Sequence, residues 1–511
     1  MIVQFNVRDF LDRAEFAYPD RAALVDEPDQ PAAAWDSVTF RELAERARAQ
    51  AAGLDRLGVG RGERVAVVSQ NSSRLLTSFF GVCGWGRVLV PINFRLAPAE
   101  VAYIVDHSGA SVLLVDPELD EALAEVGAPH RFVLGTDSDP VLFPRGGDPR
   151  PWESDEGATA TINYTSGTTA RPKGVQLTHR NCWVNAAVFG WHVQLSDRDV
   201  YLHTLPMFHA NGWGAPWATV AMACPQVVLR KVDGTEILRR VEQRDVTLLC
   251  AAPAVVNAVL DALATWDRAV PGRDVTRIVV AGAPPPSRTI ERIESELGWE
   301  FIQLYGLTET APVLTFNRRR PEWDDLPSAE RARKLMRAGA PAVGTEVRVD
   351  TSGEVLARSN TVMEGYWRQP AESEQALAGG WFHTGDGGQL DEEGHLSILD
   401  RKKDVIITGG ENVSSIEVED AIFSLPGVAE VAVIGIPDET WGEKVIALVV
   451  VSDGAALTED HVIAHCREVL AGYKCPKQVE FREILPRTAT GKLQKFRLRA
   501  PYWEGLDRQV H

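Results

Sequence analysis

The chain has 511 residues, more than a single hydrophobic core usually holds, so we expect two or more domains. Hydrophobic residues make up 45% and charged residues 24%, a balance that excludes a disordered or fibrous chain. With 53 Lys and Arg against 71 Asp and Glu, the formal charge is -18, which repels nucleic-acid phosphates. We therefore expect no nucleic-acid partner.

The cysteines and the N-terminal segment bear on the cellular compartment. The six cysteines are scattered, and no pair has the CxxC spacing of a metal or redox site. The opening MIVQFNVRDFLDRAEF carries charges where a secretory signal needs an apolar run, and no later run of 18 apolar residues occurs. We expect a cytoplasmic protein without integral membrane segments.

Short apolar runs alternate with helix-like segments over the first 150 residues. Residues 64–68, 88–93 and 111–116 predict buried strands, and similar runs recur near Val246 and Arg277. Apolar strands separated by helices pair in parallel in a sheet that is covered on both faces. The α/β fold class is therefore expected for the first part of the chain.

The pattern changes after about Gly344. Short strands and turns, including GTEVRVD, GEVLARS and a hairpin-like DEEG, predict an antiparallel β subdomain. After Arg401, a segment of mixed strands and helices, with Ser414 or Ser415 as a helix cap, predicts a small α+β domain. The expected fold is thus a large N-terminal domain with parallel-rich sheets and an antiparallel subdomain, followed by a small C-terminal domain.

The strongest local motif is YTSGTTARPKG, from Tyr164 to Gly174. Its hydroxyls, flexible backbone N–H groups and ammonium are the groups that a loop uses to bind polyphosphate. It differs from the GxxxxGK[ST] phosphate loop, because Lys173 is followed by Gly174. Taken alone, it is more typical of a solvated Ser/Thr-rich turn after the strand ATINY.

Four further motifs lie downstream of this loop. They are QLYGLTET from Gln303, WFHTGDGG from Trp381, DRKKDVIITGGENVSS from Asp400 and PRTATGK from Pro486. With these five motifs in order over nearly its whole length, the chain resembles the adenylate-forming superfamily of acyl-CoA synthetases, adenylation domains and luciferases. The resemblance implies an AMP-forming acyl-CoA synthetase that uses ATP, Mg²⁺ and coenzyme A. Such an enzyme joins a carboxylic acid to AMP, releases pyrophosphate and passes the acyl group to CoA.

The resemblance assigns phosphate and metal contacts to named residues. It implies that the ATP phosphates are bound by Thr165, Ser166, Gly167, Thr168, Thr169 and Lys173. Glu309, with the Thr168 hydroxyl, is the implied Mg²⁺ ligand, since this cation prefers a few oxygen donors. Position 170 is usually glycine in the family and is Ala170 here.

The resemblance likewise assigns the nucleoside contacts and the catalytic lysine. Adenine is expected between Tyr305 and the turn Gly282, Ala283 and Pro284, and Gly306 and Thr308 are expected among the other cofactor-binding residues. Asp386 is expected to accept hydrogen bonds from both ribose hydroxyls, supported by Arg401. Lys492 is the implied adenylation lysine, whose point charge can bridge the substrate carboxylate and the α-phosphate.

The family's domain organisation predicts an ATP- and acyl-binding domain over residues 1–399, a hinge at 400–401 and a mobile lid over 402–511. Asp400 is the expected pivot. One arrangement of the lid presents Lys492. The other presents Gly409, Gly410, Glu411 and Asn412 to the pantetheine of CoA.

The acyl group is expected near PMFHANGW, residues 206–213. The implied pocket residues are His209, which we also include among the catalytic candidates, Asn211 and Trp213. This segment and the charged stretch 318–344 resemble medium- and long-chain fatty acyl-CoA synthetases, so such an acid is the expected substrate. Trp213 is either the gate of an acyl tunnel or an ordinary core aromatic.

Three other functions remain open at this point. The chain could load a carrier protein as an acyl-AMP ligase, activate an aryl or other small organic acid, or bind ligands without catalysis. The presence of Lys492, Glu309 and Asp386 disfavours the last. An amino-acid substrate is disfavoured because no acidic residue lies within 209–213. The expected partners are the acid, ATP and CoA, and a homodimer is left open.

Overall fold

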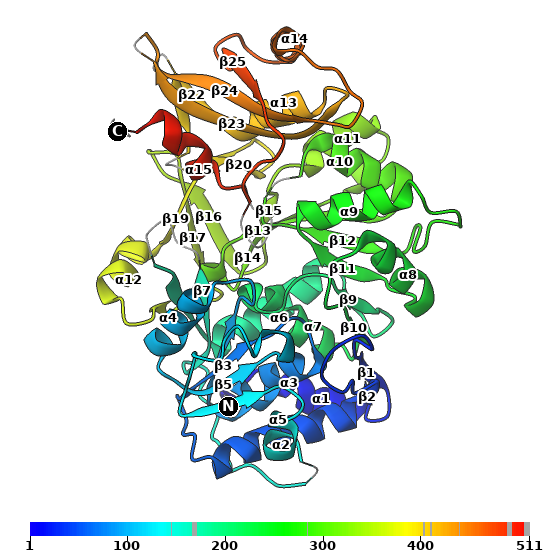
Figure 1. Ribbon diagram of the computed structural model, residues 1–511, viewed down its shortest axis with the longest axis vertical. Helices are drawn as coiled ribbons and strands as arrows, with labels where there is room; N and C mark the ends of the chain where they lie inside the picture. The colour runs from blue at the N-terminus through cyan, green and yellow to red at the C-terminus, as the bar shows by residue number, and fades with distance from the viewer. Residues whose placement is uncertain are drawn as a thin grey trace.

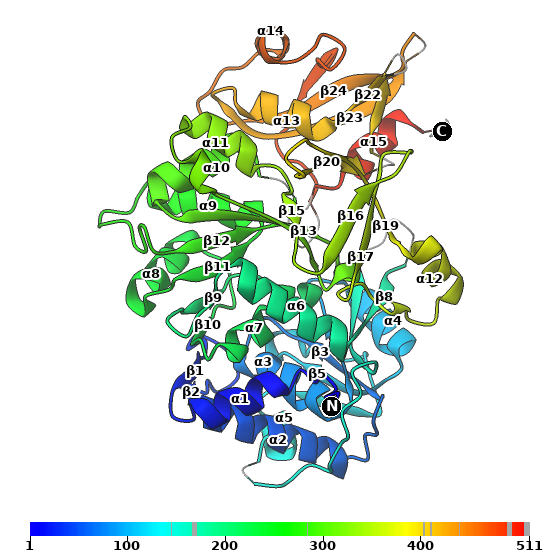
Figure 2. The ribbon, with the colours of Figure 1, turned by 180° about the vertical axis from the view of Figure 1, so that it is seen from behind.

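The computed structural model describes residues 1–144, 146–165, 171–283, 285–401, 404–408, 411–438, 440–487 and 493–504, without the side chains of Arg401 and Asn412. A lower body is built from the blue, cyan and green parts of the chain, and the orange and red C-terminal domain lies at the opposite end (Figures 1 and 2). The yellow-green antiparallel strands lie between them (Figure 1).

The first sheet of the lower body has seven strands in the order β18-β8-β7-β4-β3-β5-β6. Strands β7, β4, β3, β5 and β6 pair in parallel, and β8 and β18 add an antiparallel edge. The expected parallel sheet is therefore confirmed. Its strands are β3 (Arg64–Val68), β4 (Val88–Ile92), β5 (Ala110–Val115), β6 (His130–Val133), β7 (Thr159–Thr165), β8 (Lys173–Thr178) and β18 (Gly365–Tyr366).

The second sheet has nine strands in the order β15-β14-β13-β12-β11-β9-β10-β1-β2. Its centre, from β13 to β1, is parallel, and β2, β14 and β15 pair antiparallel at the edges. The strands are β1 (Ala22–Val25), β2 (Ser37–Thr39), β9 (Tyr201–His203), β10 (Gln226–Val228), β11 (Leu248–Ala251), β12 (Arg277–Val280), β13 (Glu300–Gly306), β14 (Val313–Arg318) and β15 (Ala340–Pro341).

Helices cover both sheets, and their termini follow from local capping. The Thr39 side chain accepts a hydrogen bond from the Glu42 N–H while the Glu42 carboxylate accepts one from the Thr39 N–H, so a capping box starts α2. The Ser72 hydroxyl caps the N-terminus of α3 by accepting a hydrogen bond from the Leu75 N–H. The helices are α1 (Asp9–Ala17), α2 (Phe40–Arg56), α3 (Ser73–Gly81), α4 (Pro98–Ser108), α5 (Ser138–Leu142), α6 (His179–His192), α7 (Ala215–Ala221), α8 (Gly234–Arg244), α9 (Pro253–Leu263), α10 (Ser287–Arg292), α11 (Ser328–Leu335) and α12 (Pro370–Ala376).

The two sheets of the lower body meet along a buried polar seam. The Arg230 guanidinium donates to both carboxylate oxygens of Asp116, at 3.0 and 3.1 Å, and the side chains are 4% and 1% exposed. The Asn71 side-chain amide lies 3.1 Å from the carbonyl oxygens of His203 and Leu229. Because each bond joins segments that follow strands of different sheets, the seam holds the sheets in one relative position.

The antiparallel subdomain and the C-terminal domain each contain one further sheet. The order is β16-β17-β19-β20 in the first and β22-β21-β24-β23 in the second, where β25 also pairs with β24. The strands are β16 (Thr345–Val349), β17 (Glu354–Ser359), β19 (Phe382–Leu390), β20 (Leu396–Arg401), β21 (Ile406–Thr408), β22 (Glu411–Val413), β23 (Val428–Asp438), β24 (Gly442–Val451) and β25 (Gln478–Phe481).

Three helices pack on the C-terminal sheet: α13 (Ser415–Phe423), α14 (Glu459–Val469) and α15 (Lys495–Arg499). Of the two serines expected to cap α13, Ser414 is the one that does so, because its hydroxyl accepts a hydrogen bond from the Glu417 N–H. The fold class, with parallel-rich sheets, an antiparallel subdomain and a C-terminal α+β domain, is confirmed. The mobility of that domain stays a prediction.

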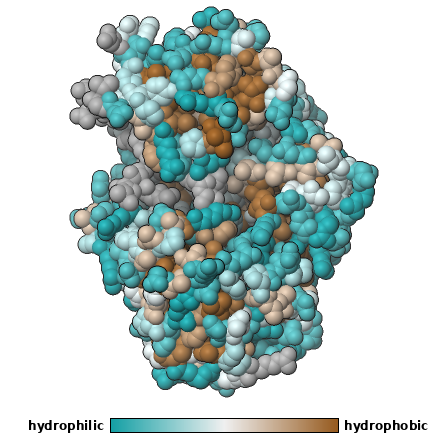
Figure 3. All heavy atoms as spheres, in the orientation of Figure 1, coloured by the Kyte–Doolittle hydropathy of each residue, from teal (hydrophilic) through white to brown (hydrophobic). Residues whose placement is uncertain are grey.

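On the face shown in Figure 3, hydrophobic side chains occur in small groups among hydrophilic ones. Within the described ranges, none of the helices combines the length and apolar character that a membrane crossing needs.

Candidate functional site

The residues expected to bind the nucleoside lie together. Tyr305 is near the end of β13 in the nine-stranded sheet, and Asp386 is on β19 of the antiparallel subdomain. The Tyr305 hydroxyl donates to Asp386 Oδ2 at 2.7 Å, and Asp386 is 5% exposed. The Asp386 N–H donates to the Thr384 hydroxyl at 3.1 Å, which adds a local backbone restraint. An aromatic face and a carboxylate are thus fixed side by side.

The residues expected at the phosphates and metal also converge. Glu309 lies in the 3-10 turn Thr308–Thr310, and Tyr366 of β18 donates from its hydroxyl to Glu309 Oε1 at 3.0 Å. The Met363 N–H donates to the Glu309 carbonyl at 2.8 Å. Lys173 Nζ lies 4.9 Å from the centre of the Tyr366 ring. A carboxylate and an ammonium therefore flank one aromatic ring.

This donor set fits a phosphate-bound Mg²⁺. The described residues provide the Glu309 carboxylate as a hard oxygen ligand and the Lys173 ammonium as a phosphate partner. Mg²⁺ commonly takes one or two carboxylates and completes its coordination with phosphate oxygens and water. Thr168, the second expected ligand, lies outside the described residues.

The phosphate motif joins β7 and β8. Thr165 pairs with Lys173 and Tyr164 with Gly174, so the two strands hold both ends of the motif. At Gly174, a Cβ would lie 2.8 Å from Ile162 Cγ2, so this position needs glycine for packing. The remaining expected phosphate residues, Ser166, Gly167, Thr168 and Thr169, and the substituted Ala170 lie outside the described residues.

The two other glycines of the expected nucleotide site differ in their roles. Gly282 follows β12, has φ +93° and is exposed with Ala283, as expected of a turn that faces a ligand. Pro284 lies outside the described residues. Gly306 and Thr308 are partly buried at the end of β13 and in the turn after it. At Gly306, a Cβ would lie 1.6 Å from the Pro312 carbonyl oxygen. Close packing alone therefore requires glycine at position 306.

The expected acyl segment forms a left-handed turn, His209–Gly214. Residues 210–213 all have φ between 44° and 60°. The Asn211 amide donates to the Thr161 hydroxyl at 2.9 Å and its oxygen accepts from the Asn163 amide at 3.0 Å. Trp213 is 3% exposed and belongs to the main hydrophobic core, while His209 is partly buried. Asn211 thus anchors the turn, and its role as a pocket residue stays a prediction.

Asp400, the expected pivot, is tied to the C-terminal domain. It is 4% exposed on β20, and Oδ2 accepts the Ser415 N–H at 3.2 Å and the Ser415 hydroxyl. Lys495 donates to the same hydroxyl and pairs with Glu419 at 2.8 Å. Burial alone lowers the pKa of the Lys495 ammonium, but the charges of Glu419 and Asp400 outweigh it and raise that pKa. Lys495 is therefore held in its charged form.

The remaining expected residues are placed only in part. Arg401 pairs with Asp386 through the backbone, and its side chain is not described. Glu411 is exposed at the start of β22, and the backbone of Asn412 pairs with Ile407. Gly409, Gly410 and Lys492 lie outside the described residues.

Two family models match the chain. The model described as AMP-binding enzyme covers residues 11–367, and the model for its C-terminal domain covers residues 417–492. The chain belongs to the AMP-binding enzyme family. This result confirms the resemblance to the adenylate-forming superfamily.

Similar proteins with known names are CoA ligases and synthetases. The chain is 40% identical to 4-hydroxybutyrate–CoA ligase 2 of Metallosphaera sedula, over 96% of this chain and 93% of that protein. It is 35% identical to the peroxisomal acetate/butyrate–CoA ligase AAE7 of Arabidopsis thaliana, over 96% and 93%. The solved fatty acyl CoA synthetase of Mycobacterium tuberculosis matches with 31% identity and a TM-score of 0.75, over 98% and 99%. This AMP-binding enzyme is accordingly an acid–thiol ligase.

Sequence reasoning missed several side chains at the site of this AMP-binding enzyme. Tyr366 holds Glu309, and Ser415, Glu419 and Lys495 surround Asp400. The doublet Tyr366-Trp367 directly follows Gly365 in a turn-rich stretch, and such a placement is a usable signal for Tyr366. The other three lie on regular helices, where the sequence alone does not distinguish them from surface residues.

Among the described residues, Asp391, Glu393 and His395 could hold a metal by distance alone, since their ligand atoms lie within 4.8 Å of one another. The Arg337 guanidinium pairs with Asp391 and Glu393, and Lys334 also pairs with Glu393, so two positive charges offset the two acids. His395 Nε2 lies 2.7 Å from the Arg320 guanidinium, so Nε2 accepts and the proton is on Nδ1. A protonated Nδ1 cannot bind a metal, so this cluster is an ion-pair network.

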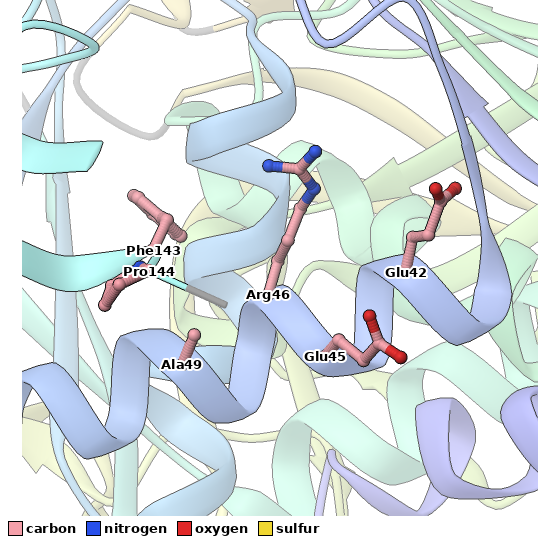
Figure 4. A pocket seen from close by; sticks show the side chains of 6 residues that line it. All are labelled: Glu42, Glu45, Arg46, Ala49, Phe143 and Pro144. Atoms are coloured by element: carbon pink, nitrogen blue, oxygen red, sulfur yellow. The ribbon is translucent and has the colours of Figure 1, made fainter. Parts of the chain in front are cut away.

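A shallow groove lies on α2, at the far end of the molecule from α13 (Figures 1 and 4). Arg46 stacks on Trp35 at 3.9 Å, and Phe143 packs edge-on against the same ring at 5.2 Å. These contacts explain the groove as local packing of the AMP-binding domain. Its lining residues are Glu42, Glu45, Arg46, Ala49, Phe143 and Pro144.

Proposed function

We propose that this enzyme activates a short carboxylic acid with ATP to acyl-AMP and pyrophosphate, and then transfers the acyl group to CoA. The observation that carries the proposal is the convergence of Glu309 and Lys173 on Tyr366, at the base of the Gly/Ser/Thr motif. A carboxylate and an ammonium in that place suit a metal–polyphosphate group. The paired Tyr305 and Asp386 supply the groups that an adenosine needs.

Each described residue has a role that follows from its chemistry. Lys173 offsets phosphate charge, and Asp386 accepts ribose hydroxyls while Tyr305 presents its ring to adenine. Mg²⁺, when bound, neutralises charge on the phosphates. Tyr366 orients the Glu309 carboxylate by donating to Oε1 at 3.0 Å. The protein therefore acts mainly by positioning and charge neutralisation, as expected for transfer at phosphorus.

The second half-reaction is assigned to another arrangement of the C-terminal domain. We propose that rotation about residues 400–401 exchanges the loop of Lys492 for residues 409–412, so that adenylation and thiol attack use one site in turn. Asp400 supports this assignment because its carboxylate joins β20 directly to the first turn of α13. The proposed domains are residues 1–399 and 402–511.

A short acid is favoured over the medium- or long-chain acid expected from the sequence. The relative with 40% identity is named for 4-hydroxybutyrate, and another is named for acetate and butyrate. In addition, Trp213 is buried in the main hydrophobic core within the His209–Gly214 turn, and we propose that a tryptophan held there limits the length of the acyl group. The similarity to a fatty acyl CoA synthetase keeps the medium- or long-chain acid as the second candidate.

The test is a panel of acids of two to sixteen carbons, with 4-hydroxybutyrate and benzoate included. AMP release and CoA thioester are measured with and without CoA, and a phosphopantetheinylated carrier protein replaces CoA in a third series. We expect the highest kcat/KM for acids of about four carbons, because a matched apolar pocket discriminates by ~1–3 kcal/mol per methylene. A maximum at ten or more carbons would favour the second candidate, and transfer only to the carrier would reject CoA ligation.

Trp213→Ala tests the reason for the short acid. If Trp213 limits the pocket, the variant gains activity on longer acids relative to butyrate. If it acts only in packing, the variant loses ~3–5 kcal/mol of stability and all acids suffer alike. The ratio of kcat/KM for octanoate over butyrate, taken with urea unfolding, separates these outcomes.

A further inference from the structure

The C-terminal domain touches the large domain at a second place besides the hinge. In Figures 1 and 2, α13 lies beside α10. The Ser287 N–H donates to Asp420 Oδ1 at 2.8 Å, and the Ser287 hydroxyl lies 3.0 and 3.2 Å from the two carboxylate oxygens. One carboxylate of α13 thus holds the backbone and the side chain of the residue that begins α10.

Ser287 is linked closely to the turn expected to face adenine. That turn follows β12 and begins at Gly282, and Ser287 comes directly after Pro285 and Pro286. Pro285 is buried, and proline rings fix φ near −65°, so this connection is stiff. A restraint applied at Ser287 therefore reaches the turn through a few residues with little conformational freedom.

The other two acids in the same part of α13 contact their own domain. Glu417 pairs with Lys474 at 2.7 Å. Glu419 pairs with Lys495 at 2.8 Å and accepts the Val433 N–H at the same distance. Of these three acids, Asp420 is the one bonded to the large domain.

We propose that Asp420 is a positioning residue, which docks the C-terminal domain on the start of α10, close to the nucleotide turn, in this arrangement of the two domains. Because the start of α13 is tied to Asp400 through Ser415, a rotation about the hinge carries Asp420 away from Ser287. Asp420 therefore contacts Ser287 during the half-reaction that uses this arrangement, and it makes no such contact during the other. This assignment to half-reactions rests on the proposed function.

The coupling runs in both directions. A contact that exists in one arrangement and restrains the start of α10, close to the nucleotide turn, makes nucleotide affinity depend on domain position. By thermodynamic linkage, a nucleotide that orders the turn stabilises the docked arrangement by the same factor.

The first test reads the contact directly by hydrogen–deuterium exchange. The Ser287 amide proton is held by Asp420, so Asp420→Ala is expected to speed its exchange by about tenfold. Glu417→Ala is the matched control, because it removes an acid one turn away that pairs inside its own domain. Unchanged exchange in Asp420→Ala, or an equal rise in the control, would overturn the proposal.

The second test separates the half-reactions. Acyl-AMP formation is followed by acid-dependent pyrophosphate exchange, and thioester formation by supplying acyl-AMP and CoA. Asp420→Ala is expected to slow one of these by about five- to tenfold and to leave the other within twofold, whereas Glu417→Ala slows neither. Equal slowing of both steps, with a lower unfolding midpoint, would show a merely structural role and overturn the proposal.

The double variant completes the test. Ser287→Ala removes the hydroxyl from the large-domain side, so Asp420→Ala in that background should lose less than it does in the wild type. Additive losses would overturn the pairing. An inactive wild-type protein on every acid of the panel would instead reject the proposed function, and the exchange measurement would still decide the contact.

Discussion

The seam inside the large domain and the boundary with the C-terminal domain are built differently. At the seam, Arg230 and Asp116 form a two-bonded ion pair that is almost fully buried, and Asn71 reaches carbonyl groups across the two sheets. At the boundary, Asp420 and Ser287 are only partly buried. Asp420 is on α13 of the C-terminal domain, and Ser287 begins α10 of the large domain. The Arg230–Asp116 contact is almost inaccessible to water, whereas the Asp420–Ser287 contact is partly accessible to it.

This difference decides which joint can open during catalysis. Breaking a buried ion pair leaves a desolvated charge without a partner, at a cost of several kcal/mol. The partly exposed carboxylate of Asp420 can exchange its hydrogen bonds for bonds to water at a small net cost. The seam therefore maintains one geometry for the nucleotide site, while the boundary permits the rotation that we propose.

The largest predicted effect comes from breaking the seam. Arg230→Met should lower the free energy of unfolding by about 3–5 kcal/mol, because Asp116 stays buried without its partner. Urea unfolding followed by tryptophan fluorescence measures it. Arg41→Met, which removes an exposed partner of Asp20, is the control and should cost less than about 1 kcal/mol. Equal losses in the two variants would contradict the comparison.

Breaking the boundary at its pivot should stop turnover, with a loss of stability that Asp400→Ala shares, because Asp400 is buried and accepts hydrogen bonds from Ser415. Asp400→Pro restricts the backbone at the hinge, so one half-reaction survives while the overall reaction falls by roughly 100-fold. Asp400→Ala is the matched variant, since it also loses the acceptor for Ser415 but retains rotation. If both variants turn over at the same rate, residue 400 is not the pivot.

A smaller effect, on the affinity for MgATP, is expected from the contact between Tyr366 of the seven-stranded sheet and Glu309, which follows β13 of the nine-stranded sheet. Tyr366→Phe deletes the hydroxyl that donates to Glu309, so the carboxylate is less well oriented. The apparent affinity for MgATP should fall by about tenfold, with the unfolding midpoint nearly unchanged. The measurement is KM for ATP at several Mg²⁺ concentrations, and an unaltered Mg²⁺ dependence would remove Tyr366 from the proposed role.

The smallest effect is a change in acid sensitivity of the large domain. Burial lowers the pKa of His179 from 6.5 to about 4, so the unfolded chain takes up a proton at a higher pH than the native chain does. Stability contributed by this residue is therefore lost as pH falls from about 6.5 towards 4. His179→Asn should reduce the fall in unfolding free energy over this window, measured by urea titrations at each pH, and an identical slope would contradict it.

The sequence predicts the fold well where the residues of an element share one character, such as a continuous apolar run in a strand or Asp and Gly in a turn. The apolar runs at 64–68 and 277–280 are β3 and β12, because strands covered on both faces need continuous apolar residues. The Asp391–Gly394 turn likewise joins β19 to β20, as its Asp and Gly content predicts. At the candidate site, motif order predicts Tyr305, Asp386 and Glu309, and the fold places Tyr305 beside Asp386 and Glu309 beside Tyr366.

The partners themselves were harder to predict because they depend on distant segments. Tyr366 is on β18 of the seven-stranded sheet, whereas Glu309, 57 residues away, lies in the turn between β13 and β14 of the nine-stranded sheet. Asp420 and Ser287 are 133 residues apart, and their contact exists only if the two domains adopt one relative position. The role of Asn211 as an anchor also requires the register of β7, which sets Thr161 and Asn163 on the same face.

The left-handed turn beside the proposed acyl site limits how this enzyme can be evolved in the laboratory. Ala210, Asn211 and Trp213 all have positive φ, a conformation that β-branched side chains adopt only at a steric cost. In a randomised library over these positions, β-branched substitutions would lose stability for this reason, whatever acid is used in the screen. Diversity is better introduced on α6, whose side chains face the turn from a helix with ordinary backbone angles, so that new specificities can be sampled without rebuilding the loop.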